Sequence, residues 1–222
     1  MPLTYWFWTY LMRGLLLLCS RWKVMGRENV PPKGPLIIVA NHFSFIDPPL
    51  VSASVSRRIS FLAKQELFRF LPLRLMVSSF GAIAVRRGRS SRYALERCQT
   101  LLARGQALGI FPENRRNREG QLQHAQRGVA LLALRTGAPI LPVAILGSEK
   151  VQSAADIFFR RPSITVVVGQ PFVLEPPEEE TADALQARAD LVMYRIALLL
   201  PESHRGPFGR EYAAAAPLGN KV

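Results

Sequence analysis

Apolar residues occur along this chain in short uninterrupted runs, separated by longer stretches of mixed polarity. The runs 36–40 and 140–146 consist of apolar residues and proline, and each directly follows a proline. Such runs are typical of strands that are buried on both faces of a sheet. By the same reasoning we expect strands near Val24 and over residues 36–40, 59–63, 82–85, 107–111, 140–146 and 164–168.

Between these runs, apolar residues recur every three or four positions, which is the helical spacing. The pattern predicts helices over residues 5–19, 66–80, 91–104, 127–136 and 181–200, and one more that starts on Pro48 and Pro49. Strands that alternate with helices are typical of a parallel sheet with helical crossovers. We therefore expect an α/β fold: a single domain over residues 24–200, with a mostly parallel twisted sheet flanked by helices.

The two ends of the chain differ from this domain. Residues 1–23 begin with a run, 3–12, that is apolar and aromatic, and Arg13 interrupts it. Because a spanning helix needs roughly 20 mainly apolar residues, we expect a membrane-associating helix that lies in the interface. The alternative is a helix packed on the domain's own core. Residues 201–222, rich in Gly, Pro and Ala, predict a mobile C-terminal tail.

Positive charge is concentrated in the first 135 residues. They contain 21 Lys or Arg and 6 Asp or Glu, and the whole chain of 222 residues has a net charge of +13. Such a surface attracts an anionic membrane, and also an acidic acyl carrier protein or the phosphates of coenzyme A. Nucleic acid is disfavoured as a partner, because the interleaving of basic and aromatic residues that single-strand binding requires is missing.

The candidate chemistry begins directly after the strand predicted at 36–40. His42 precedes Asp47 by five residues, a spacing that lets the two side chains meet across a turn but not on one helical face. A neutral imidazole oriented by a carboxylate is what a general base requires, and active sites in open α/β sheets collect beyond the carboxyl ends of strands. The simpler interpretation is a loop histidine beside an aspartate that caps the next helix.

Three further segments have the same form, an apolar strand that runs into a turn. Residues 81–88 end in paired arginines, residues 109–116 continue into a charged loop, and residues 137–144 are broken by prolines. Together with the His42 segment, these four blocks resemble, in order and spacing, the glycerolipid acyltransferase family, which includes 1-acylglycerol-3-phosphate acyltransferases. The resemblance extends from about Val24 to Val168, and four ordered blocks are far more specific than any one of them.

The resemblance implies a role for each matching residue. His42 would be the catalytic base and Asp47 its orienting partner. The implied substrate-binding residues are Arg87, Glu113 and Arg116, to which we add the neighbouring Arg86 and Arg115. Glu113 would align either an arginine or a substrate hydroxyl, and a solvated basic face is the alternative for the arginines.

Several positions depart from the family pattern. Asn114 replaces a glycine, and asparagine tolerates the left-handed backbone that glycine would adopt there. Arg115 replaces a threonine and adds charge beside the expected head-group site. Asn117 replaces a serine, Ala84 stands where an aromatic is common, and Arg86 stands where an acid is common.

The expected function follows from these residues. We expect an acyltransferase that moves a fatty acyl group from acyl-CoA or acyl carrier protein to the hydroxyl of a lysophosphatidate-like glycerolipid. No cofactor or metal is expected, and the enzyme would be monotopic on the cytoplasmic face of a membrane. The alternatives are a different lysolipid or glycolipid acceptor, or a non-enzymatic basic protein that binds nucleic acid or anionic membranes. A serine hydrolase is disfavoured, because the chain lacks a Gly-x-Ser-x-Gly motif.

Overall fold

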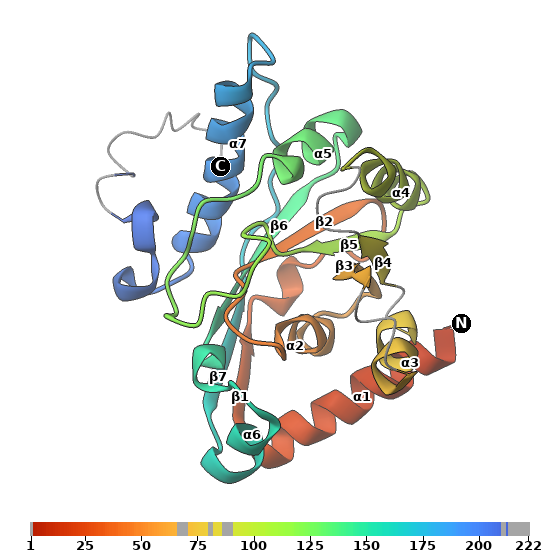
Figure 1. The fold of residues 1–222 in the computed structure, drawn as a ribbon, viewed down its shortest axis with the longest axis vertical. Coiled ribbons are helices and arrows are strands. Elements are labelled where there is room, and N and C mark those ends of the chain that lie inside the picture. The colour runs from red at the N-terminus through yellow and green to blue at the C-terminus, as the bar shows by residue number, and fades with distance from the viewer. Residues whose placement is uncertain (1, 66–70, 80–81, 86–90, 210–211, 213–222) are drawn as a thin grey trace.

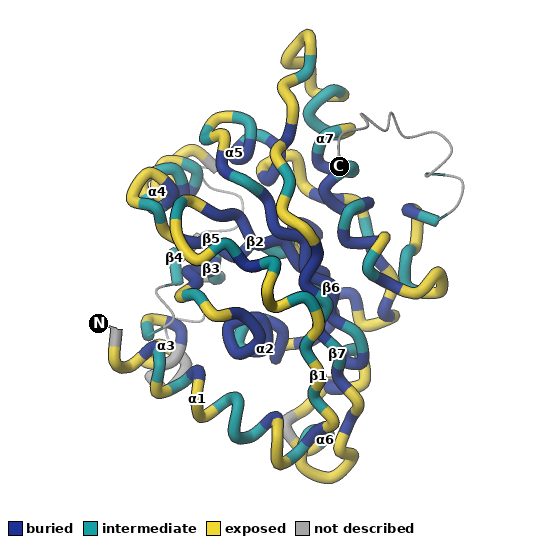
Figure 2. Tube along the Cα trace, turned by 180° about the vertical axis from the view of Figure 1, so that it is seen from behind, coloured by how far each residue is buried: buried dark blue, intermediate teal, exposed yellow. Residues whose placement is uncertain are grey.

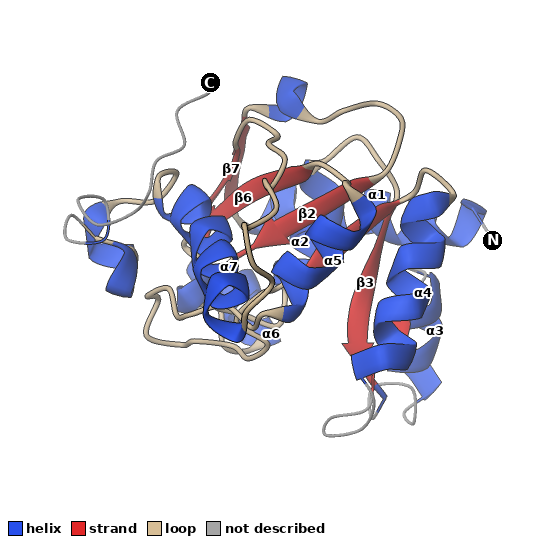
Figure 3. Cartoon of the chain, turned by 90° about the horizontal axis from the view of Figure 1, so that it is seen from above, coloured by secondary structure: helices blue, strands red, loops and turns tan. Residues whose placement is uncertain are grey.

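A twisted sheet with helices on both faces makes up the protein, as Figures 1 and 3 show. The structure is a computed structural model that describes the chain except residues 1, 66–70, 80–81, 86–90, 210–211 and 213–222. Helices α1 and α2 lie on one face of the sheet, and helices α4, α5 and α7 lie on the other. Among the described residues, the predicted single α/β domain is confirmed.

The sheet contains seven strands in the order β1-β7-β6-β2-β5-β3-β4. Neighbouring strands are parallel except for β6 and β7, which are antiparallel. A largely parallel sheet was predicted, but the reversal at β7 was not. The strands are β1 (Arg21–Met25), β2 (Leu36–Ala40), β3 (Ile59–Lys64), β4 (Ile83–Val85), β5 (Ala107–Ile110), β6 (Ile140–Leu146) and β7 (Ser163–Val168).

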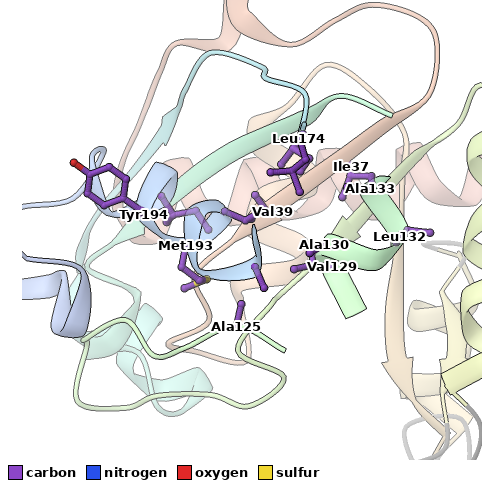
Figure 4. Packing of buried hydrophobic residues seen from close by; sticks show 14 of the residues in the cluster. Ile37, Val39, Ala125, Val129, Ala130, Leu132, Ala133, Leu174, Met193 and Tyr194 are labelled. Atoms are coloured by element: carbon purple, nitrogen blue, oxygen red, sulfur yellow. The ribbon is translucent and has the colours of Figure 1, made fainter. Parts of the chain in front are cut away.

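The central strand β2 is buried along its whole length because it has a layer of helices on each side. Its side chains alternate between the two faces. Ile37 and Val39 belong to the core beneath α4, α5 and α7, which Figure 4 shows from close by, whereas Ile38 and Ala40 belong to the core beneath α1 and α2. Burial on both faces explains why the sequence of β2 is a continuous apolar run.

All the predicted helices occur, with ends that differ by a few residues where they can be compared. The described helices are α1 (Pro2–Cys19), α2 (Asp47–Ser54), α3 (Leu71–Ser79), α4 (Ser91–Ala103), α5 (Gly128–Thr136), α6 (Ala154–Arg160) and α7 (Ala182–Ala197). Residues 66–70 and 80 of the predicted helix 66–80 lie outside the described part of the chain. Helix α6 was not predicted. Its signal was the capping box of Ser153 and Asp156, which fixes the first turn.

Helix α1 has an unusual distribution of polar and apolar side chains. The side facing the domain contains Tyr5, Thr9 and Arg13, all of which form hydrogen bonds. The exposed side contains six large apolar and aromatic residues: Leu3, Phe7, Tyr10, Leu11, Leu17 and Leu18. Figure 2 shows this exposed edge. None of the helices in the described chain is both long enough and apolar enough to cross a membrane.

Both predicted domain boundaries fall within packed structure. The boundary at residue 23 lies inside β1, which pairs with β7. After α7, two 3-10 turns at Glu202–His204 and Gly206–Phe208 follow, and Phe208 is fully buried. Residues 201–209 of the segment expected as a tail are therefore part of the domain, because Phe208 joins its core.

Gly109 in β5 makes room for a neighbouring aromatic ring. A Cβ atom there would overlap the ring of Phe61, whose residue pairs with Gly109 across the sheet. We expect Gly109→Ala to lower the free energy of unfolding by about 1–3 kcal/mol, because an overpacked core has to shift. Urea unfolding measures this effect. Gly128→Ala is the matched control, since a Cβ at Gly128 would meet nothing within 4 Å; equal losses in the two variants would contradict the explanation.

Candidate active site

The candidate site lies where β2 and β5 end, at the carboxyl edge of the parallel strands. Asn41 follows β2 and fixes the start of the turn, because its side chain exchanges two hydrogen bonds with the backbone of Ile145 in β6, at 2.8 and 2.7 Å. These bonds continue the β2–β6 pairing one residue beyond the strand. His42 therefore leaves the sheet from a rigid point.

His42 and Asp47 meet across the turn, as their spacing predicted. The distance from His42 Nδ1 to Asp47 Oδ2 is 2.9 Å. The same oxygen accepts hydrogen bonds from the backbone N–H groups of Phe43 and Ser44, both at 2.7 Å. Asp47 is the first residue of α2 and its carboxylate faces back into the turn, so the interpretation as an N-cap is wrong.

The imidazole ring of His42 is held on its face as well as at its edge. It stacks on Phe111, with ring centroids 4.3 Å apart, and Phe111 in turn stacks on Phe61. The His42 side chain is 18% exposed, whereas the Asp47 side chain is fully buried. With Nδ1 bound to Asp47, Nε2 is the ring nitrogen left for an incoming group; it has no hydrogen-bond partner within the described chain. Phe111 had no predicted role, because its stacking on His42 depends on the register of β5 against β2, and its stacking on Phe61 on that of β5 against β3.

The carboxyl group of Glu113 accepts hydrogen bonds from the backbone of the site rather than from an arginine side chain. Its Oε1 accepts the N–H of His42 at 3.1 Å, and its Oε2 accepts the N–H of Gln123 at 3.2 Å. Burial raises the pKa of Glu113 to about 8, although these two hydrogen bonds oppose the shift. The nearby charge of Asp47 raises the pKa further and that of Arg115 lowers it. Glu113 is therefore mainly protonated at neutral pH.

The loop after β5 is tied to the turn that contains His42. The backbone N–H of Asn117 donates to the carbonyl of His42 at 2.8 Å, and the Asn117 side chain bonds to the loop at Glu119 and Gln121. Asn114 has φ of 57°, so the predicted left-handed conformation at this position is confirmed. The loop therefore has at Asn114 the left-handed backbone conformation that a glycine would adopt.

An open cleft of about 930 Å³ lies beside Glu113. Its walls include Asn114, Arg115, Gln123 and His124. The Arg115 side chain is oriented by a 2.7 Å hydrogen bond from its Nε to Gln123 Oε1. Arg116 is exposed and is not part of the cleft wall. Arg86 and Arg87 lie outside the described residues.

His124 has a partner on a distant segment of the chain, which was not predicted. Its Nδ1 is 3.1 Å from Asp190 Oδ1 on α7, which also accepts a bond from Gln186. The two residues are 66 positions apart, so only the packing of α7 on the sheet brings them together. Across the described residues, no group of three or more His, Cys, Asp or Glu side chains is arranged to hold a metal ion.

Protonation of Glu113 should make folding pH-dependent. The folded protein binds this proton with a pKa of about 8, against an ordinary value of 4.5, so stability falls as pH rises between these values. Between pH ~6 and ~8.5, the wild type should lose about 2–3 kcal/mol of unfolding free energy relative to Glu113→Gln, whose side chain does not titrate in this range. Urea unfolding across this range measures the difference. Parallel pH profiles for the two proteins would mean that Glu113 is ionised throughout.

Comparison with known proteins identifies the family of this site. A 1-acyl-sn-glycerol-3-phosphate acyltransferase of Borreliella burgdorferi is 35% identical over 128 residues, covering 57% of this chain and 51% of that protein. The human 1-acyl-sn-glycerol-3-phosphate acyltransferase alpha is 29% identical over 196 residues, covering 86% and 68%. The matches to two chloroplast relatives, from Brassica napus and Arabidopsis thaliana, span 44% and 42% of their lengths, so the chain matches only about half of several relatives.

A solved structure has the same fold. The crystal structure of the 1-acyl-sn-glycerophosphate (LPA) acyltransferase PlsC from Thermotoga maritima matches with a TM-score of 0.63 and 26% identity, covering 82% of this chain and 72% of that one. Residues 21–146, more than half of this chain, match the family described as Acyltransferase. The resemblance to the glycerolipid acyltransferases is confirmed: the chain belongs to this acyltransferase family.

Proposed function

We propose that this protein transfers a fatty acyl group from an acyl thioester to the hydroxyl of a lysophosphatidate-like glycerolipid. The observation that carries the proposal is the pairing of His42 Nδ1 with Asp47 Oδ2 at 2.9 Å, which leaves Nε2 as the ring nitrogen for chemistry. The names of the relatives, 1-acyl-sn-glycerol-3-phosphate acyltransferases, support the same acceptor class.

The proposed reaction uses His42 as base and then as acid. The Nε2 atom takes the proton of the acceptor hydroxyl while its oxygen attacks the thioester carbonyl. Asp47 keeps the proton on Nδ1 and stabilises the imidazolium that forms. When the tetrahedral intermediate collapses, the carbon–sulfur bond breaks and the thiolate leaves with the proton from Nε2. The products are the ester and the free thiol of coenzyme A or of acyl carrier protein, and the chemistry requires no cofactor.

The arginines are proposed to bind the phosphate of the acceptor. A guanidinium group suits a phosphate because it forms paired, charge-assisted hydrogen bonds. Arg115 supports this role by its place in the wall of the cleft beside Glu113. Arg116 and Arg87 are proposed for the same role from the resemblance alone, and Arg86 from its position beside Arg87.

Arg115 also favours a second candidate, acylation of a different lysolipid or a glycolipid. Its positive charge stands where the family pattern has a threonine, so it changes the cleft that we assign to the head group. A panel of lysolipids offered with one acyl thioester, with the mass of the products as readout, separates the two candidates. Product from lysophosphatidate alone supports the first.

The proposed acceptor is a membrane lipid, and we propose that the protein lies on the cytoplasmic face of an anionic membrane as a monotopic protein. The exposed apolar side of α1 supports this location, because Thr9 and Arg13 of this helix face the domain instead. The positive charge of the first 135 residues suits an anionic surface.

Replacing His42 tests the mechanism. A general base contributes about 10² to 10⁴-fold, so His42→Ala should lower kcat for acyl transfer by at least ~100-fold in a protein that still unfolds cooperatively. Thioester consumption, followed by release of the free thiol, measures the rate. His204→Ala, a histidine outside the proposed machinery, is the control and should keep its rate. An undiminished kcat in His42→Ala would refute the assignment.

Replacing the arginines tests the phosphate site. Arg115→Ala or Arg116→Ala should raise KM for a phosphorylated acceptor by about tenfold, the effect of one lost charge-assisted hydrogen bond. An acceptor without the phosphate should be affected far less. Arg118→Ala removes an exposed charge from the same loop and is the matched control. Equal changes in all three variants would indicate a general electrostatic effect rather than a binding site.

A further inference from the structure

Helix α6 carries an exposed pair of aromatic residues. Phe158 and Phe159 keep 55% and 86% of their area exposed, although α6 is only seven residues long. Exposing two neighbouring phenylalanines to water is unfavourable, since burying one is worth about 1.5–3 kcal/mol. Core packing does not explain them, so they indicate a surface that meets a partner.

The pairing of β1 with β7 brings α6 beside the end of α1. Each helix is followed directly by its strand, and these two strands are parallel neighbours. The backbone N–H of Arg21 donates to the carbonyl of Pro162 at 2.9 Å, which joins the two helix ends. Figure 1 shows α6 next to the carboxyl end of α1. Leu17 and Leu18 of α1, which are 65% and 73% exposed, thus belong to the same part of the surface as the two phenylalanines.

Basic residues follow both apolar helix ends. Arg21 and Lys23 are exposed on β1, and Arg160 and Arg161 are exposed at the end of α6. The acidic group of this region, Asp156, is turned into the helix cap, where it accepts bonds from Ser153 and Gln152, and it also pairs with Arg160. The surface therefore combines an apolar centre with a positive rim.

We propose that this α1–α6 surface, made of Leu17, Leu18, Phe158 and Phe159 with the four basic residues, docks on an anionic phospholipid bilayer. The apolar side chains enter the boundary between head groups and acyl chains, and the arginines and lysine meet lipid phosphates. Charge complementarity selects this partner. The proposal rests on the proposed function, which requires a membrane lipid as acceptor, and adds α6 as a second contact beside α1.

The same segment is connected to the candidate active site. The hydroxyl of Ser44, in the turn that carries His42, donates to the carbonyl of Val151 in a buried hydrogen bond. Val151 lies two residues before the N-cap of α6, Ser153. Docking through α6 therefore fixes the orientation of the catalytic turn relative to the bilayer.

Vesicle sedimentation with the full chain tests the surface. We expect Phe158→Ala combined with Phe159→Ala to reduce partitioning onto vesicles of mixed phosphatidylglycerol and phosphatidylcholine by roughly 10- to 100-fold. Val173→Ala combined with Leu198→Ala is the matched control, because these residues are exposed apolar side chains outside this surface. Unchanged partitioning of the phenylalanine variant would overturn the proposal. Phe159→Ser alone provides a second test at the more exposed of the two positions.

The basic rim is tested separately. Arg160→Gln combined with Arg161→Asn should weaken binding to the anionic vesicles by about fivefold per residue, and binding to phosphatidylcholine alone should change little. Asparagine suits Arg161, whose φ of 41° is left-handed. An equal loss on both kinds of vesicle would overturn the role of charge. A wild-type dimer that the phenylalanine variant dissociates, with vesicle binding intact, would instead assign the surface to a second copy of the chain.

Activity measurements separate this proposal from the proposed function. The phenylalanine variant should keep the wild-type rate with a short-chain acceptor that is monomeric in solution, and lose rate with a long-chain acceptor in vesicles. If His42→Ala proves inactive while the phenylalanine variant binds vesicles normally, the docking surface fails and the enzyme assignment stands. Loss of vesicle binding in the phenylalanine variant supports the surface, even if no thioester is consumed by the wild type.

Discussion

The buried carboxylate of Asp47 is the group on which the candidate site depends. Its side chain is fully buried. Its Oδ2 accepts hydrogen bonds from two backbone N–H groups and lies 2.9 Å from Nδ1 of the His42 ring. Burying a carboxylate away from water costs free energy, and charge-assisted hydrogen bonds offset this cost. The other oxygen, Oδ1, is buried with no hydrogen-bond partner among the described residues. The side-chain hydrogen bonds of Asp47 within the described chain thus converge on one atom, which fixes the turn and the ring together.

A second carboxyl group, Glu113, holds the same histidine from its backbone side. It connects the N–H of His42 to the loop after β5, and Asn117 of that loop returns a hydrogen bond to the carbonyl of His42. The pKa of Glu113 is raised to about 8, mainly by burial and further by the charge of Asp47. The two carboxyl groups differ in role because Asp47 contacts the imidazole ring, whereas Glu113 accepts hydrogen bonds from backbone N–H groups.

Much of this arrangement could be predicted from local sequence. The bounds of β2 and β6 were predicted correctly because both strands are buried on two faces and lack polar residues. The spacing of His42 and Asp47 predicted a meeting across a turn, and the identity of Asn114 predicted its left-handed backbone. Each of these features depends on residues that are close together in the chain.

The features that were missed depend on contacts between distant segments. The stacking of Phe111 on His42 and the hydrogen bonds of Glu113 require β5 to lie beside β2 in one register, which the spacing along the chain does not specify. The pairing of His124 with Asp190 requires the packing of α7. The reversal at β7 was missed for a similar reason, since an alternating pattern of strands and helices does not reveal the direction of an individual strand.

Arg13 shows how the apolar helix α1 and the candidate site are physically connected. In the sequence this residue interrupts the apolar run, which argued against a spanning helix. In the structure its guanidinium donates to the carbonyls of Ala53 and Val55, at 2.8 and 3.3 Å, and so satisfies the carboxyl end of α2. A positive charge is favourable there because the carbonyl groups at a helix end are unpaired and carry partial negative charge. Since α2 begins with Asp47, the exposed apolar side of α1 is attached through one short helix to the carboxylate that orients His42.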